Sequence, residues 1–208
     1  MFVKVCGLRT GADVAAAVSA GADAIGFVFA DSPRRVSAAA ARQLAAQVPP
    51  HILTVGVFRG IAAADAGRIA LDAGVGAVQL HGSYPRAAFG ELAALPVRLV
   101  RATALDAGTD VRAGAYGEDM LLLDSPVPGS GQPWDLAALG PARPQGQWLL
   151  AGGLTPANVA AAITAAQPWG VDVSSGVESS RGVKDHGLIR QFVAAAREAG
   201  PAQSTAAR

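Results

Sequence analysis

The feature that most restricts the fold of this chain is a series of eight apolar runs, each followed by an alanine-rich stretch. The runs Ala24–Phe29 and Met120–Leu123 are continuously apolar, as strands buried on both faces of a parallel sheet are. Eight runs in 208 residues leave about 26 residues for each unit, which is enough for one strand and one helix. The runs begin near Val3, Ala24, Leu53, Gly76, Val97, Met120, Trp148 and Val171.

Residues that favour helix ends stand between these runs. Thr10 and Asp185 can each cap the start of a helix, and Gly21 suits the left-handed residue that ends one. Thr155 followed by Pro156 predicts a helix with proline at its first position. The last helix is expected over residues 186–199, directly after Asp185. The pattern is therefore strand then helix, repeated along the chain.

Eight such units with nothing left over predict an α/β fold, a single (β/α)8 TIM barrel over residues 1–199. The stretch Thr103–Asp119 holds three glycines and little apolar periodicity, so we expect a loop or a stunted helix in place of the fifth helix. Residues 200–208 are small and polar, and we expect them to be disordered. An open doubly wound sheet is the alternative, but no G-x-G-x-x-G motif follows the first strand.

Charge and cysteine content exclude several classes of partner. The net charge is +1 without a basic cluster, so we expect neither nucleic acid nor a membrane surface as a partner. No run approaches the ~18 apolar residues of a membrane span. The single cysteine cannot form an internal disulfide, which suits a reducing cytoplasm. His51, His81 and His186 lack metal-ligand spacing, so we expect no metal and no cofactor.

Two loops that follow strands have the composition of a phosphate site, and the loops after the strands are where such barrels act. Gly152 and Gly153 follow the seventh strand and allow backbone amides to approach an anion near a helix start. Ser174, Ser175 and Gly176 follow the eighth strand and add hydroxyls and further amides. Each motif alone can be a turn or a helix cap. The two together favour phosphate.

The ends of strands one, two and six carry groups suited to proton transfer and carboxylate binding. Lys4 and Cys6 share one face of their strand, so we expect the thiol to have a lowered pKa and to act as a base. Asp124 closes an apolar run, where burial would raise its pKa and keep it partly protonated. Arg34 suits a substrate carboxylate, and the alternative is that Arg34 and Arg35 are solvated. Alternatively, the cysteine is a small buried hydrophobe and Lys4 simply pairs with Asp172.

In this order, the residues resemble phosphoribosylanthranilate isomerase, a family of tryptophan biosynthesis. The resemblance covers nearly the whole chain, and an ordered set of so many motifs is highly specific. It rests on Lys4–Leu8, Gly21–Phe29, Ser32–Arg34, Val55–Phe58, Val78–Gly82, Leu122–Asp124, Gly152–Pro156, Asp172–Glu178 and Lys184–His186.

The resemblance implies an Amadori rearrangement of N-(5′-phosphoribosyl)anthranilate to 1-(o-carboxyphenylamino)-1-deoxyribulose 5-phosphate. By position, Asp124 is similar to the general acid that opens the ribose ring, and Cys6 to the general base that takes the C2′ proton. Arg34 matches the arginine that holds the anthranilate carboxylate, and Asp172 a residue near the sugar hydroxyls. The phosphate loops are matched by Gly153 and Ser174–Gly176.

The sequence departs from the family in two places. Arg35 stands where the family usually has an aromatic residue, and the loop Pro128–Leu136 is shorter than usual. We expect these changes to affect affinity or specificity at the anthranilate end rather than the reaction type.

Two other functions fit the same residues. The related barrel isomerase of histidine biosynthesis has an aspartate where this chain has Cys6, and a non-catalytic phosphate-binding barrel is the second alternative. We expect the partner to be a small phosphorylated substrate, bound by a monomer or a homodimer.

Overall fold

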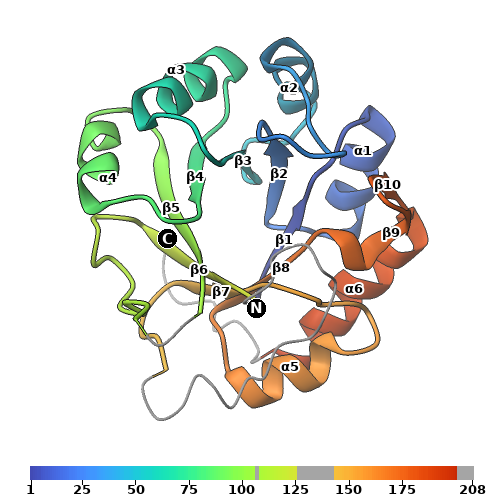
Figure 1. Cartoon of the computed structure of the whole chain (residues 1–208). Coiled ribbons are helices and arrows are strands. Elements are labelled where there is room, and N and C mark those ends of the chain that lie inside the picture. The colour runs from blue at the N-terminus through green and yellow to red at the C-terminus, as the bar shows by residue number, and fades with distance from the viewer. Residues whose placement is uncertain (106–107, 126–142, 201–208) are drawn as a thin grey trace.

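The computed structural model describes residues 1–105, 108–125 and 143–200, and its centre is a closed barrel of eight parallel strands (Figure 1). Each strand pairs with its neighbours in the sequence, and β8 pairs with β1 to close the barrel. The predicted TIM barrel is confirmed, and each strand begins within one residue of its expected start. The strands are β1 (Phe2–Cys6), β2 (Ala24–Val28), β3 (Leu53–Phe58), β4 (Ala77–His81), β5 (Arg98–Ala104), β6 (Met120–Asp124), β7 (Trp148–Leu150) and β8 (Gly170–Val173).

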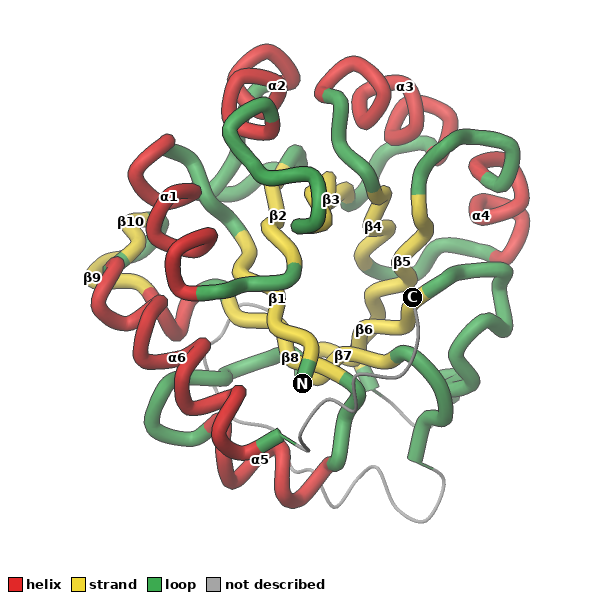
Figure 2. Tube along the Cα trace, turned by 180° about the vertical axis from the view of Figure 1, so that it is seen from behind, coloured by secondary structure: helices red, strands yellow, loops and turns green. Residues whose placement is uncertain are grey.

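The helices form a ring outside the strands (Figure 2). The Thr10 hydroxyl accepts the Asp13 N–H at 3.1 Å, while the Asp13 carboxylate accepts the Thr10 N–H, so both groups start the first helix. Gly21 ends that helix with φ 86°, and Asp185 caps the last helix. These predictions are confirmed. The helices are α1 (Gly11–Ala20), α2 (Ala38–Ala45), α3 (Ala63–Ala73), α4 (Arg86–Leu92), α5 (Val159–Ala166) and α6 (His186–Ala199).

The core has two layers because alternate residues of each strand point to opposite faces. On β2, Ala24 and Val28 belong to the cluster inside the barrel, whereas Ile25 and Phe27 pack with the helices outside. Burying a large side chain such as Phe27 contributes roughly 1.5–3 kcal/mol relative to leaving it exposed. The barrel is thus filled with side chains, and only its rim is open to polar groups.

One wall of the barrel is covered by a loop instead of a helix. Among the described residues between β5 and β6, 108–119 form turns and no helix, as expected. Arg101 points out from β5 and forms a buried ion pair with Glu118 at 2.7 Å. Its guanidinium also donates to the carbonyls of Asp110 and Arg112 and lies over the Tyr116 ring. The buried guanidinium of Arg101 therefore organises the loop that stands between β5 and β6 in place of a helix.

Two details differ from expectation. The helix predicted to start at Pro156 begins at Val159, after a turn over residues 156–158. The Val159 N–H already donates to the Thr155 carbonyl with helical spacing, and the Asn158 side chain accepts the Thr155 N–H at 2.7 Å as in a capping box, so the difference lies in the regularity of the first turn. After β8, the chain forms the short helix η2 (Ser175–Val177) and a hairpin of β9 (Glu178–Ser180) and β10 (Val183–Lys184) before α6.

The expected disorder of residues 200–208 falls outside the described residues except for Gly200, and the altered loop Pro128–Leu136 lies entirely outside them. Across the described ranges, no helix combines the length and apolar character needed to cross a membrane.

Candidate active site

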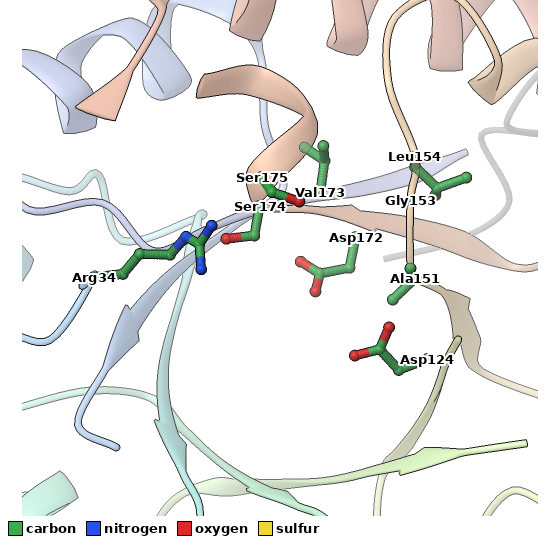
Figure 3. A pocket seen from close by; sticks show the side chains of 10 residues that line it. Arg34, Asp124, Ala151, Gly153, Leu154, Asp172, Val173, Ser174 and Ser175 are labelled. Atoms are coloured by element: carbon green, nitrogen blue, oxygen red, sulfur yellow. The ribbon is translucent and has the colours of Figure 1, made fainter. Parts of the chain in front are cut away.

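The side chains singled out in the sequence gather at the rim formed by the carboxyl ends of the strands. One cavity there is lined by Cys6, Arg34, Asp124, Asp172 and Ser174, among others. A smaller pocket beside it shares four of these residues and is also lined by Gly152, Gly153 and Ser175. Figure 3 shows Arg34 and Asp124 on opposite sides of this pocket, with Ser174 and Asp172 between them. The two hollows therefore form one continuous site.

Cys6 ends β1 and points into the cavity, where its thiol is buried. Gly26 of β2 makes this possible, since a Cβ at that position would lie 2.6 Å from the Cys6 Sγ. Burial raises the pKa of the thiol, and the Lys4 ammonium lowers it by less, so the net direction is upward. The expected lowering of this pKa is wrong, because desolvation of the thiolate outweighs the nearby cation.

Lys4 lies beneath the cavity and is almost completely buried. Its Nζ donates to Asp172 Oδ1 at 2.9 Å across the pairing of β1 with β8. The pairing of Lys4 with Asp172, considered as an alternative above, is therefore confirmed. Burial alone would lower the pKa of Lys4, but the Asp172 carboxylate and the Cys6 thiol raise it. The floor of the site thus carries a charged ammonium beside the thiol.

Asp124 ends β6 on the opposite side of the cavity. Burial raises the pKa of its carboxyl group, although the Ser125 N–H donates to Oδ1 at 2.8 Å and opposes the shift. This agrees with the expected direction. His81 Nε2 lies 3.6 Å from Asp124 Oδ2, and burial lowers the pKa of the imidazole. A carboxyl group whose pKa is raised by burial therefore faces the cavity beside an imidazole whose pKa is lowered by burial.

Glycines allow the loops after β6, β7 and β8 to pack closely around the smaller pocket. Gly152 has φ 87°, and a Cβ there would lie 2.5 Å from the Ser125 backbone nitrogen. A Cβ on Gly176 would lie 1.8 Å from the Leu154 carbonyl oxygen, so only glycine fits between these loops. Gly176 is absent from the lining of both hollows and acts instead as a packing position. Ser174 is held by donating from its hydroxyl to the Cys6 carbonyl at 3.2 Å.

Arg34 follows β2 and reaches into the site from the side of β1. Its Nε and Nη2 donate to the two carboxylate oxygens of Glu178 at 2.7 and 2.8 Å. One edge of the guanidinium is therefore already bound to a carboxylate of the protein itself.

The sequence matches the family described as N-(5'phosphoribosyl)anthranilate (PRA) isomerase over residues 3–195. This chain belongs to that family. The N-(5'-phosphoribosyl)anthranilate isomerase of Deinococcus radiodurans is 44% identical over 200 residues, which cover 94% of this chain and 96% of that protein.

Solved structures of the PRA isomerase family have the same fold. The structure of TrpF from Jonesia denitrificans is 52% identical with a TM-score of 0.89, covering 96% of this chain and 98% of the other. A phosphoribosyl anthranilate isomerase in complex with reduced 1-(o-carboxyphenylamino)-1-deoxyribulose 5-phosphate is 34% identical with a TM-score of 0.83. The match covers 95% of this chain and 99% of the other.

Within this PRA isomerase, several residues of the site carried no role in the sequence analysis. Gln79 and the arginines Arg59 and Arg181 line the same cavity as Cys6. Alternation along β4 places Gln79 on the face of His81, which is a signal that the sequence does contain. The two arginines stand on loops, where alternation carries no information. Among the described residues, no group of three or more His, Cys, Asp or Glu side chains has the arrangement of a metal site.

Proposed function

We propose that Cys6 and Asp124 act as general base and general acid in the isomerisation of N-(5′-phosphoribosyl)anthranilate by this member of the PRA isomerase family. The observation that carries the proposal is the placement of a thiol and a protonatable carboxyl group in one cavity that continues into a glycine- and serine-lined pocket. Proton transfer at carbon combined with protonation of an oxygen needs such a pair.

In the first step, the protonated Asp124 donates its proton to the ribose ring oxygen. The bond from C1′ to that oxygen breaks, and the anthranilate nitrogen lone pair forms a Schiff base with C1′. The raised pKa of Asp124 supports this role, because an acid must still hold its proton near neutral pH. The Asp124 carboxylate that remains can then accept a proton when the product forms.

In the second step, the Cys6 thiolate removes the C2′ proton, the C–H electron pair forms the C1′=C2′ double bond, and the π electrons of the C1′=N bond return to nitrogen to give an enolamine. The enolamine tautomerises to the ketone by losing its C2′ hydroxyl proton and gaining one at C1′. Because burial favours the neutral thiol, the Lys4 ammonium has the task of stabilising the thiolate. The ion pair with Asp172 holds that ammonium in place.

The remaining residues are assigned to the two ends of the substrate. Arg34 takes the anthranilate carboxylate, and Asp172 lies near the sugar hydroxyls while it pairs with Lys4. The phosphate lies in the pocket lined by Gly152, Gly153, Ser174 and Ser175, which Gly176 supports from behind. The reaction as proposed uses no cofactor or metal. A cytoplasmic location and a monomer or homodimer remain expectations.

The deciding experiment follows the loss of anthranilate fluorescence when purified protein is added to freshly generated substrate. Cys6→Ala and Asp124→Asn should each lower kcat by at least ~10²-fold, the contribution of one general acid or base. Asp65→Asn is the control, since it removes an exposed carboxylate from α3 without touching the site. Near-wild-type turnover in either site variant would disprove that assignment. No turnover by wild type would favour the non-catalytic alternative.

A further inference from the structure

Glu178 stands behind Arg34 and occupies one full edge of its guanidinium. The two hydrogen bonds, from Nε at 2.7 Å and from Nη2 at 2.8 Å, form a bidentate pair. Such a pair fixes the plane of the guanidinium as well as its position. The Nε edge is thus closed to a ligand, and the edge carrying Nη1 is left to face the site, where Arg34 lines both hollows.

Glu178 is itself held from two other directions. Lys184 Nζ donates to its Oε1 at 2.9 Å, and the Gly182 N–H donates to Oε2 at 2.9 Å. Burial raises the pKa of Glu178, but the hydrogen bonds from Arg34, Lys184 and Gly182 lower it to about 2. The carboxylate is therefore ionised near neutral pH, and its hydrogen bonds hold it against Arg34.

The same network reaches the phosphate end of the site. Lys184 also donates to the Ser174 carbonyl at 2.7 Å, and the Ser174 hydroxyl is bonded to the Cys6 carbonyl. Lys184 and Glu178 have only 1% and 4% of their side-chain surface exposed. A buried chain of contacts thus joins Arg34 to the loop after β8 and to the end of β1.

The stem of Arg34 is fixed as well. It crosses Gly7, where φ is +78° and a Cβ would lie 2.7 Å from the Arg34 Cδ. Any side chain at position 7 would therefore displace the Arg34 side chain from this position. Packing against the Gly7 backbone and the bidentate pair with Glu178 together fix the position of the guanidinium.

We propose that Glu178 is a positioning residue that turns Arg34 toward the substrate and, through Lys184 and Ser174, sets its distance from the phosphate pocket. The site then selects ligands whose carboxylate and phosphate have one separation. This inference rests on the proposed function, because it takes the substrate carboxylate to be the ligand of Arg34. It assigns to Glu178 a role in specificity rather than in proton transfer.

The test compares two probes that differ in one group: reduced 1-(o-carboxyphenylamino)-1-deoxyribulose 5-phosphate and its analogue without the ring carboxylate. The ratio of their dissociation constants, measured by calorimetry, reports how well the protein recognises the carboxylate. In Glu178→Gln this ratio should fall about 10-fold or more, the scale of a hydrogen bond to a charged group. Binding of the analogue without the carboxylate should change little.

Two further variants make the test specific. Glu178→Asp keeps the charge but is too short to close the bidentate pair, so the ratio should fall there as well. Glu118→Gln is the matched control, because Glu118 is a buried glutamate paired with Arg101, and neither residue lines the two hollows of the site. It should lower the melting temperature and leave the ratio unchanged. In an Arg34→Ala background, Glu178→Gln should have no further effect on the ratio.

A ratio within twofold of wild type in both folded Glu178 variants would overturn the inference. A wild-type protein that binds both probes equally would instead overturn the assignment of Arg34 in the proposed function, so the two failures are distinguishable.

Discussion

Replacing Gly176 with alanine would place a methyl carbon between the loops that follow β7 and β8. The new Cβ would lie 1.8 Å from the Leu154 carbonyl oxygen and 2.8 Å from its carbonyl carbon. Both are backbone atoms, so no side chain can rotate away to make room. The two loops would have to separate by more than about 1 Å to restore ordinary contact distances.

This separation should affect binding more than folding. Forcing one carbon into a packed region costs about 1–3 kcal/mol, which lowers the melting temperature of a chain of this size by about 2–12 °C. The same loops line the proposed phosphate pocket, and a misplacement of about 1 Å costs roughly 10²-fold in rate. We therefore expect kcat/KM of Gly176→Ala to fall by about 10²-fold and its inhibition constant for inorganic phosphate to rise.

The assay is steady-state fluorescence of the substrate, with phosphate as a competitive inhibitor and the melting temperature measured in parallel. Gly90→Ala is the control, because Gly90 lies in α4 and a Cβ there meets no atom within 4 Å. It should stabilise the helix by up to about 1 kcal/mol and leave kinetics unchanged. A folded Gly176→Ala variant with kcat/KM and phosphate inhibition within twofold of wild type would refute this reasoning.

Two predictions concern charge. Lys4→Met removes the cation beside Cys6 and should raise the pKa of the thiol, so the acid limb of the kcat/KM profile should move to higher pH; an unmoved limb in a folded variant would exclude this role. The second concerns Glu178, whose pKa of about 2 lies below its usual 4.5. Its ion pairs stabilise the fold above about pH 4.5 and are lost toward about pH 2. The melting temperature of wild type should fall over that range more than that of Glu178→Gln; equal falls would contradict it.

The barrel could be predicted because each strand is recognisable from its own residues. A strand buried on both faces reads as a continuous apolar run, as Met120–Leu123 does, and the strand therefore begins where the run begins. The start of α5 differs from the prediction by three residues. A threonine before a proline favours a helix start, and the Val159 N–H does bond to the Thr155 carbonyl, but residues 156–158 form a turn and the regular helix begins only at Val159.

The site was harder to predict than the fold, because its chemistry depends on depth and on distant partners. Alternation along β1 places Lys4 beside Cys6, but it does not say how far the thiol lies below the rim. Burial decides the direction of that pKa. Likewise, Arg34 and Glu178 are separated by 144 residues, and nothing local to either one indicates the pair.

The closing of the barrel has a consequence for how the protein is made. Lys4 and Asp172, and Cys6 and Ser174, meet across the seam between the first and last strands, 168 residues apart in each case. Contacts between such distant residues form late in folding, because a long loop must close first. A nascent chain whose β8 is still inside the ribosome therefore has no ammonium fixed beside the thiol. In this molecule, the proposed reactive centre is completed only when synthesis of the barrel is complete.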